Sequence, residues 1–243
     1  MHLHSPDFLY SQGLIPGPEE SEEHFAKRVE TSLKNCVDPS LWKECWEETE
    51  KRWKFKICWV PITFSTKELH FWEAAVTWRE EDALFLHLHP RLQQGSFWGY
   101  SRKEILLHES IHILRASFEK EYRFEEHLAY LSSSKSWVAF LGPLINSSKD
   151  MLCIFAAIIA LLFSSYFFSI PLWSYFLPFL PFFPSFLYRR YILKKCRKKI
   201  PLPLLFLLSD KEIYACAKAK QPVQVLKNAS LLRQKFFSLF YTL

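Results

Sequence analysis

The stretch ILLHESIHILRASFEKEYRFEEHLAY, residues 105–130, carries two histidines four positions apart with a glutamate between them, and a pair of adjacent glutamates further on. The preceding residues SRKE, 101–104, form a capping box and predict a helix that begins about two turns before His108. On that helix His108 and His112 share one face, one turn apart, a spacing that lets two imidazoles bind one metal ion. The stretch therefore predicts a metal site on a helix, with Glu109 beside it.

A second helix is predicted for residues 123–133, joined to the first by the segment FEKE at 118–121. When two such helices pack antiparallel, equal distances from their connection place Glu126 opposite His112. A carboxylate there can serve as a third metal ligand. The sequence thus predicts a site built from two neighbouring helices.

The pattern formed by His108, Glu109 and His112 is HExxH, and through it the chain resembles the zincin metallopeptidases. Zincins carry this motif on a helix that follows an antiparallel sheet, and they take a third ligand from downstream. The resemblance implies Zn²⁺ bound by His108, His112 and Glu126, with a fourth position open for water. It also implies that Glu109 takes a proton from that water and delivers it to the leaving amine of a peptide.

The choice of Glu126 as third ligand rests on the resemblance to the glutamate-type zincins. In these proteins a small residue stands three positions after the ligand glutamate, as Ala129 does after Glu126. Glu125 is the alternative ligand. Tyr130 stands where aspartate often follows in that family, and is a candidate for a group that contacts the ligands rather than the metal. Arg115 is a second such candidate, as a partner of Glu125.

Three segments before the metal-site helix have strand character, residues 55–65, 68–79 and 83–90. We expect a small antiparallel sheet. Either 68–79 or 83–90 is expected to be an exposed edge, to which an extended substrate adds as a further strand, as in zincins. Three further histidines, whose roles stay open between structural contacts, oxyanion stabilisation and metal binding, are His87, His89 and His127.

Helical periodicity also marks both ends of the chain. Residues 19–36 and 39–53 carry abundant charge at helical spacing. Near the C-terminus, residues 209–212 form a second capping box, and an apolar face predicts a helix over 223–240. Packing on the rest of the protein and binding at a membrane surface both suit these C-terminal helices.

Residues 151–188 contain no Asp, Glu, Lys, Arg or His, which predicts a membrane segment. A spanning helix needs about 20 apolar residues, so the run accommodates two passes. We expect them at about 151–170 and 172–188, with a turn at residues 169–171 and with prolines that make the second pass irregular. This closely spaced pair also resembles the bilobed hydrophobic hairpin of chlamydial inclusion-membrane proteins.

The cluster RRYILKKCRKK, residues 189–199, follows the second pass and predicts a cytoplasmic flank that contacts anionic lipid headgroups. Because two passes return the chain to its starting side, both soluble parts are expected in the cytoplasm. The net charge of +6 owes much to this cluster and therefore does not indicate nucleic-acid binding. The six cysteines form no CxxC pair, which fits a reducing compartment.

The sequence predicts an α+β protein in four parts: a zincin-like catalytic domain at 1–140, a transmembrane hairpin at 151–188, a basic juxtamembrane cluster at 189–200 and a C-terminal helical segment at 201–243. The expected function is a membrane-anchored zinc-dependent metallopeptidase that acts on proteins or peptides. One alternative is a non-catalytic membrane-anchored protein whose cytoplasmic domain binds a partner. The other is a di-iron protein based on the ExxH pair Glu109 and His112, but no second ExxH follows the later glutamate pair.

Overall fold

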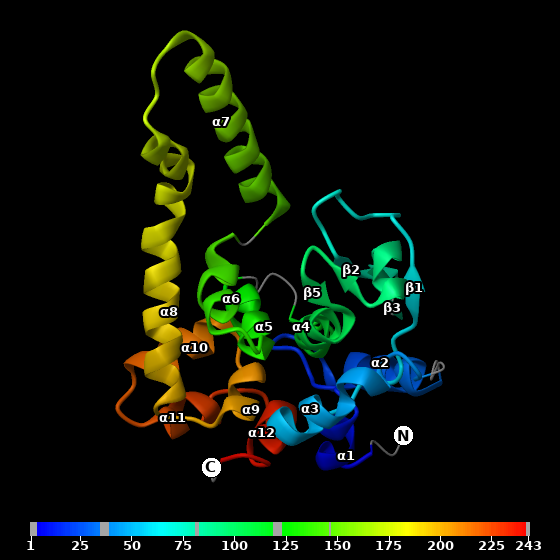
Figure 1. Ribbon diagram of the computed structural model, residues 1–243. Coiled ribbons are helices and arrows are strands. Elements are labelled where there is room, and N and C mark those ends of the chain that lie inside the picture. Colours follow the sequence, from blue (N-terminus) through cyan, green and yellow to red (C-terminus); the bar gives the residue numbers. More distant parts are fainter. Residues whose placement is uncertain (1–3, 35–38, 81–82, 119–122, 146, 242–243) are drawn as a thin grey trace.

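The computed structural model describes residues 4–34, 39–80, 83–118, 123–145 and 147–241. These residues form an α+β structure, as the sequence predicts. Helices and a small sheet make up the body, and a long hairpin rises from it (Figure 1). Most of the expected helix connection at 118–121 lies outside the described residues.

Three helices begin the chain, α1 (Pro6–Ser11), α2 (Glu22–Lys34) and α3 (Lys43–Trp53). Helices α2 and α3 confirm the helices predicted within 19–36 and 39–53, although each is shorter than its predicted range. Residues 35–38 are not among the described residues. Their apolar positions enter the core, where Phe25 of α2 and Trp53 of α3 are fully buried.

The expected strand at 55–65 is correct only for β1 (Ile62–Phe64). The indole N–H groups of Trp42 and Trp46 each donate to a carbonyl oxygen of the preceding extended segment at 2.8 Å. Pro61 has no backbone N–H to offer a neighbouring strand. These two indoles therefore satisfy the carbonyls of Ile57 and Val60, and the first backbone bond from β3 reaches Pro61, just before β1.

The sheet continues with β2 (Ala75–Glu80) and β3 (Ala83–Leu88), which pair antiparallel, whereas β1 and β3 pair parallel. The expectation of an antiparallel sheet is therefore wrong. The physical reason is the connection at 65–74, which carries the chain to the far edge before it returns through the middle. Because the order is β1-β3-β2, the segment 83–90 is not an edge, and 68–79 supplies the edge strand β2.

A tight hairpin links the sheet to the next helix. After the 3-10 helix η1 (Pro90–Gln94), strands β4 (Ser96–Phe97) and β5 (Tyr100–Ser101) enclose a two-residue turn. Both turn residues are left-handed, Trp98 with φ 50° and Gly99 with φ 80°, as a hairpin of this length prefers. The turn holds the Trp98 side chain out from the body, 72% exposed.

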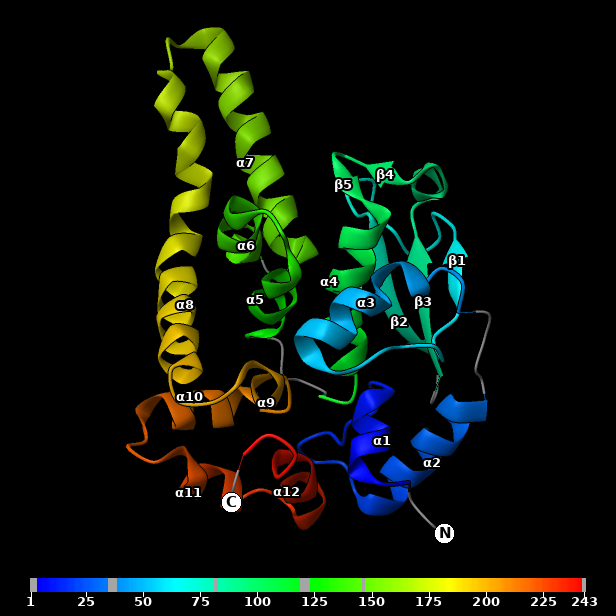
Figure 2. The same cartoon turned by 60° about the horizontal axis from the view of Figure 1, so that its bottom comes forward.

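Helix α4 (Arg102–Leu114) begins at the predicted capping box, which is confirmed. The Ser101 hydroxyl accepts from the Glu104 N–H at 3.2 Å, and the Glu104 carboxylate accepts from the Ser101 N–H at 2.9 Å. Both orphan donors at the helix start are thereby satisfied. Figure 2 shows α4 between the sheet and the next helix, α5 (Glu125–Ala129).

Short helical pieces then lead to the hairpin, η2 (Tyr130–Ser132), α6 (Ser136–Leu141) and η3 (Gly142–Leu144). The predicted helix at 123–133 is thus divided between α5 and the 3-10 turn η2.

The apolar run forms α7 (Ser148–Phe167), then η4 (Leu172–Phe182) and α8 (Phe183–Arg197), so the turn predicted at 169–171 is confirmed. Within the described part of the chain, one helix is long and apolar enough to cross a membrane, Lys149–Phe167. The second apolar segment is largely a 3-10 helix. Pro178 and Pro181 lie inside it and remove the N–H groups that an α-helix would need.

The C-terminal segment folds onto the body as α9 (Leu202–Phe206), α10 (Asp210–Lys218), α11 (Pro222–Lys227) and α12 (Leu231–Phe237). The capping box at 209–212 is confirmed. The single helix expected at 223–240 is wrong, because Ser230 caps a new helix by accepting from the N–H of Arg233. Side chains of this segment share one apolar core with the N-terminal helices, for instance the Phe25–Phe236 ring pair at 5.9 Å.

A buried ion pair fixes the entry to α2. Arg28 donates two hydrogen bonds of 2.8 Å to the Glu20 carboxylate and one of 2.7 Å to the carbonyl of Ile15. Gly17 donates its N–H to the same carboxylate at 2.8 Å. Burial raises the pKa of Glu20, but the bonds from Arg28 outweigh burial, so the pKa lies below its ordinary value.

Because the folded-state pKa of Glu20 is depressed, the pair stabilises the fold above the unfolded-state pKa, and this contribution is lost as the pH falls through the folded-state value. We expect Glu20→Gln to lower the free energy of unfolding at pH 7 by about 2 kcal/mol. The difference from wild type should shrink between about pH 5 and pH 3. Urea unfolding of the full chain in mild detergent measures it.

The matched control is Glu30→Gln, which removes an exposed ion pair with Lys34 on the same helix and should hardly change stability. A difference between wild type and Glu20→Gln that stays constant down to pH 3 would contradict this account.

Candidate metal centre

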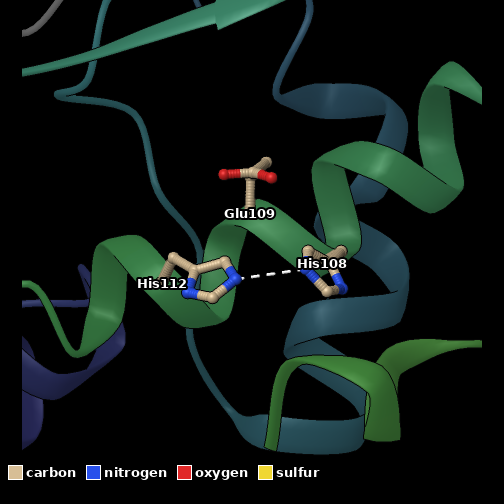
Figure 3. A group of neighbouring side chains, drawn as sticks. All are labelled: His108, Glu109 and His112. Carbon is tan, nitrogen blue, oxygen red and sulfur yellow. Dashed lines mark hydrogen bonds between the residues drawn. The ribbon is translucent and has the colours of Figure 1, made fainter. Parts of the chain in front are cut away.

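The HExxH residues occupy the middle of α4, about two turns from its cap (Figure 3). His108 and His112 lie one turn apart with their Nε2 atoms separated by 3.1 Å. Glu109 projects to a different side of the helix in Figure 3, yet one of its oxygens and a nitrogen of each imidazole lie within 4.8 Å of one another. The spacing predicted from the sequence is present, and this group could hold a metal ion.

Helix α5 brings the Glu126 carboxylate to the same two nitrogens. One oxygen lies 3.6 Å from Nε2 of His108 and the other 3.5 Å from Nε2 of His112. Two ligand atoms about 2.0–2.1 Å from a tetrahedral ion are about 3.4 Å apart. The separations of 3.1, 3.5 and 3.6 Å, the last two to different oxygens of Glu126, are each close to this value.

Glu125 occupies a different position from Glu126. Its carboxylate lies 2.8 Å from Nδ1 of His112, on the side of the ring away from the shared nitrogens. A carboxylate that accepts the Nδ1–H fixes the ring orientation and leaves Nε2 free to bind a cation. The two glutamates that the sequence leaves as alternative ligands are thus distinguished by which imidazole nitrogen each one faces.

The edge strand β2 contacts the remaining acidic group. The hydroxyl of Thr77 donates to the Glu109 carboxylate at 2.8 Å, and Glu109 is buried. Burial raises the pKa of Glu109 above its ordinary value. A residue of the sheet, Thr77, therefore orients the Glu109 carboxylate. The carboxylates of Glu125 and Glu126 belong to α5.

The centre carries an excess of acidic groups. Burial alone would lower the pKa of His112, but the carboxylates of Glu126 and Glu125 raise it to about 10. Burial, together with the neighbouring His112, lowers the pKa of His108 well below its ordinary value. Burial raises the pKa of Glu126 to about 7. A divalent cation between the Nε2 atoms would neutralise this concentration of negative charge.

A groove of about 1110 Å³ passes over the centre. One wall is formed by β2 with the residues just before it, and the other by α5, η3 and the first turns of α7. His108, His112 and Glu126 lie on its floor between these walls. Its volume lies at the upper end of the range of small-ligand pockets, so it can accommodate a short peptide over the metal-site residues.

Two aromatic side chains shape the groove beside His108. The ring of Tyr130 packs edge-on against the ring of His108, a predicted ligand, with the ring centroids 4.6 Å apart. Gly142 permits this arrangement, because a Cβ there would lie 2.3 Å from the Tyr130 ring. Trp98 lines the groove from the hairpin turn.

Arg115 lies at the C-terminal end of α4, and the structure places its guanidinium against the C-terminal segment. Nη1 donates to the carbonyl oxygens of Phe206 at 2.9 Å and Leu208 at 2.8 Å. Asp210, two residues further on, accepts from the N–H of Arg123 at 2.8 Å, just before α5. One C-terminal stretch therefore holds the end of α4 and the start of α5, the two helices that carry the centre.

The other candidate histidines serve the fold. His87 accepts a hydrogen bond from the indole of Trp78 on the neighbouring strand at 3.2 Å. His89 caps η1. His127 is buried against the ring of Phe186, and burial lowers its pKa to about 4. None of these three described side chains lines the groove.

Sequence reasoning missed Thr77, Trp98 and Asp210. The alternation of β2 and the Trp-Gly pair between two short strands are signals for the first two. Asp210 gives no local signal toward the site, because its contact with Arg123 spans 87 positions of the chain.

We expect Asp210→Ala to weaken binding of a divalent cation by about tenfold, because α5 loses an acceptor that positions it against α4. Titration of the full chain with Zn²⁺, against a competing chelator, measures the affinity. Lys211→Ala, an exposed neighbour on α10, is the matched control and should bind as wild type does. Equal affinities for Asp210→Ala and the control would show that the contact does not position the centre.

Comparisons with protein-family models, with curated proteins and with solved structures find no match to this chain.

Proposed function

We propose that the chain is a membrane-anchored, zinc-dependent peptidase whose metal is bound by His108, His112 and Glu126. The observation that carries the proposal is the convergence of two Nε2 atoms and the Glu126 carboxylate at separations of 3.1–3.6 Å, beside a separate buried carboxylate, Glu109. Two imidazoles and one carboxylate suit zinc and leave a position open for reactants.

When bound, zinc would supply a Lewis acid that polarises the scissile carbonyl and activates a water molecule. Glu109 accepts a proton from the attacking water, whose oxygen bonds to the carbonyl carbon. The C–N bond then breaks, and Glu109 returns the proton to the leaving amine. Thr77 holds the Glu109 carboxylate for these transfers, and Glu125 keeps Nε2 of His112 directed at the metal position.

The groove and the edge strand bind the substrate. β2 is an edge of the described sheet and lines the groove through residues 75–79, so its outer backbone groups can pair with an extended peptide. Tyr130 borders the reaction position beside His108 and offers a phenolic O–H to the negative charge that develops on the carbonyl oxygen.

The membrane part of the proposal extends from α7 to the whole hairpin. From Leu172 to Phe182, a 3-10 rise of about 2.0 Å per residue gives about 22 Å, and residues 183–185 of α8, before Phe186 packs against the body, add about 5 Å. This total of about 27 Å is close to the roughly 30 Å of a bilayer core. The length therefore supports two passes, with both ends in the cytoplasm by the charge of the flank.

In the basic cluster at 189–199, some side chains contact the protein and others are exposed to solvent. Arg190 and Lys199 donate to main-chain carbonyls of the body, Lys199 at the C-terminal end of α10. The exposed basic residues of this cluster are Lys194, Lys195, Arg197 and Lys198. Their side chains can contact anionic lipid headgroups.

We expect the purified full chain to contain about one zinc, and His108→Ala, His112→Ala and Glu126→Ala to lose it. Glu125→Gln should keep zinc but bind it about 10- to 100-fold more weakly, as a residue that only orients a ligand. Elemental analysis and chelator competition measure both. His4→Ala, exposed and remote from the centre, is the control. Loss of zinc from Glu125→Gln but not from Glu126→Ala would reverse the assignment.

We expect peptide hydrolysis by the zinc-loaded chain to fall by at least about 10³-fold in Glu109→Gln, while its zinc content stays at the wild-type level, because Glu109 moves protons without binding the metal. Cleavage of a peptide library, read by mass spectrometry, measures the rate. A wild-type chain that binds zinc but cleaves no better than Glu109→Gln would leave a non-catalytic interaction protein as the better account.

A further inference from the structure

The short helix α6, just before the membrane hairpin, presents an apolar face to the outside. Trp137, Phe140 and Leu141 lie at positions i, i+3 and i+4 and therefore share one side of the helix. All three are exposed, Trp137 to 64%, whereas Val138 is buried. The helix contains no charged residue. An uncovered apolar face of this kind is typical of an interaction surface.

Contacts with α8 fix the height of α6 relative to the hairpin. The ring of Phe140 lies 5.7 Å from that of Phe186, and the guanidinium of Arg190 lies 4.2 Å from the centre of the Phe140 ring. Figure 1 shows α6 at the base of the hairpin, beside α8. Residues 186–190 are where the uncharged run 151–188 gives way to the basic cluster. When the hairpin is inserted, α6 therefore lies at the boundary between acyl chains and headgroups.

The last carbonyl groups of α6 have a partner within the protein. Arg190 donates from Nη1 to the carbonyl oxygens of Ala139 at 3.3 Å and Phe140 at 3.5 Å. These carbonyls belong to the last turn of a helix, where no partner exists within the helix itself. The end of α6 therefore does not depend on water for these bonds.

The turn between β4 and β5 adds another aromatic side chain to this region. Lys135, directly before α6, donates from Nζ to the carbonyl oxygen of Gly99 at 3.1 Å. The exposed Trp98 is the other residue of the turn, so the turn places it near the start of α6.

The other leg of the hairpin gives a similar depth. The ring of Phe71, a largely exposed residue of the loop at 65–74, lies 5.9 Å from that of Phe155 in α7. Phe155 lies six residues into the apolar span Lys149–Phe167, which corresponds to a rise of about 9 Å. Interfacial helices bury their apolar faces about 5–10 Å into the same boundary. Exposed aromatic side chains thus lie at the depth of the bilayer surface beside both legs.

A bilayer fits this surface better than a protein partner does. The face of α6 is continuous with the hairpin, which is itself lipid-facing when inserted. Tryptophan is enriched at membrane interfaces, as Trp137 and Trp98 would be here. No charged side chain of α6 has to leave water when its apolar face enters the interface.

We propose that α6 lies in the bilayer interface, with the face of Trp137, Phe140 and Leu141 among the lipids and Trp98 beside them. The inference rests on the membrane insertion of the hairpin, which is part of the proposed function above. The body is then held against the membrane surface and does not stand clear of it on the two legs of the hairpin.

Thiol accessibility tests this in lipid nanodiscs that hold one full-length chain each. A membrane-impermeant maleimide is allowed to react with Trp137→Cys, Ile159→Cys and Leu231→Cys. Each rate is normalised to the denatured chain, and peptide mapping separates the new cysteine from the native ones. Ile159 lies in the apolar span and, like Trp137, is 64% exposed. Leu231, 73% exposed, lies on α12 at the other end of the body.

We expect Trp137→Cys to react at least about fivefold more slowly than Leu231→Cys, because lipid covers its thiol. Exposure in the protein alone predicts nearly equal rates. Since each disc holds one chain, a second copy cannot provide the cover. Ile159→Cys reports insertion of the hairpin and should also react at least about fivefold more slowly than Leu231→Cys.

A smaller difference between Trp137→Cys and Leu231→Cys, with Ile159→Cys protected, would overturn the docking of α6. It would leave the inserted hairpin in place and assign the apolar face to a protein partner. Labelling of Ile159→Cys at the rate of Leu231→Cys would overturn the insertion and the docking together. Neither outcome changes the assignment of the metal ligands, which zinc content tests separately.

Discussion

The 3.1 Å separation of the Nε2 atoms of His108 and His112 is the constraint on which the centre depends. Two unprotonated imidazole nitrogens so close together repel each other unless a proton or a cation lies between them. The surroundings are built to keep both rings in place despite this. The capping box sets where α4 begins, Glu125 fixes the ring of His112, and the contacts of Arg115 and Asp210 hold α4 and α5 together. The capping box therefore acts on helix register, Glu125 acts on ring orientation, and the contacts of Arg115 and Asp210 act on helix packing.

Features that depend on residues close in sequence could be predicted. The two capping boxes, the turn at 169–171 and the i, i+4 histidine pair each follow from neighbours within a few positions, and α-helix geometry converts that spacing directly into position. The order of the strands could not be predicted in this way. The loop at 65–74 is long enough to place β2 either next to β1 or one strand further away. Which order forms depends on which elements bury the apolar side chains of β3.

The roles of Glu125 and Glu126 show the same limit at the scale of one residue. Adjacent positions on a helix point about 100° apart, so only one of them faces the Nε2 atoms. Which one does so depends on how α5 is rotated against α4. One contact near the start of α5 is the bond from the N–H of Arg123 to Asp210, which lies beyond the hairpin in sequence. Spacing along the chain and the zincin resemblance favoured Glu126, but they left Glu125 as an alternative because neither gives the rotation of α5.

The shared core also bears on the membrane topology. Leu128 of α5 precedes the hairpin and Phe206 of α9 follows it, and both belong to one apolar cluster with Trp53. A chain that leaves a folded body through α7 and returns to the same body must end on the side of the membrane where it began. If α7 crosses a bilayer, the segment from Leu172 onward must cross back, whatever helix type it adopts. In that case the proline-rich 3-10 segment η4 would be the return pass, and the hairpin would be an insertion into one folded body.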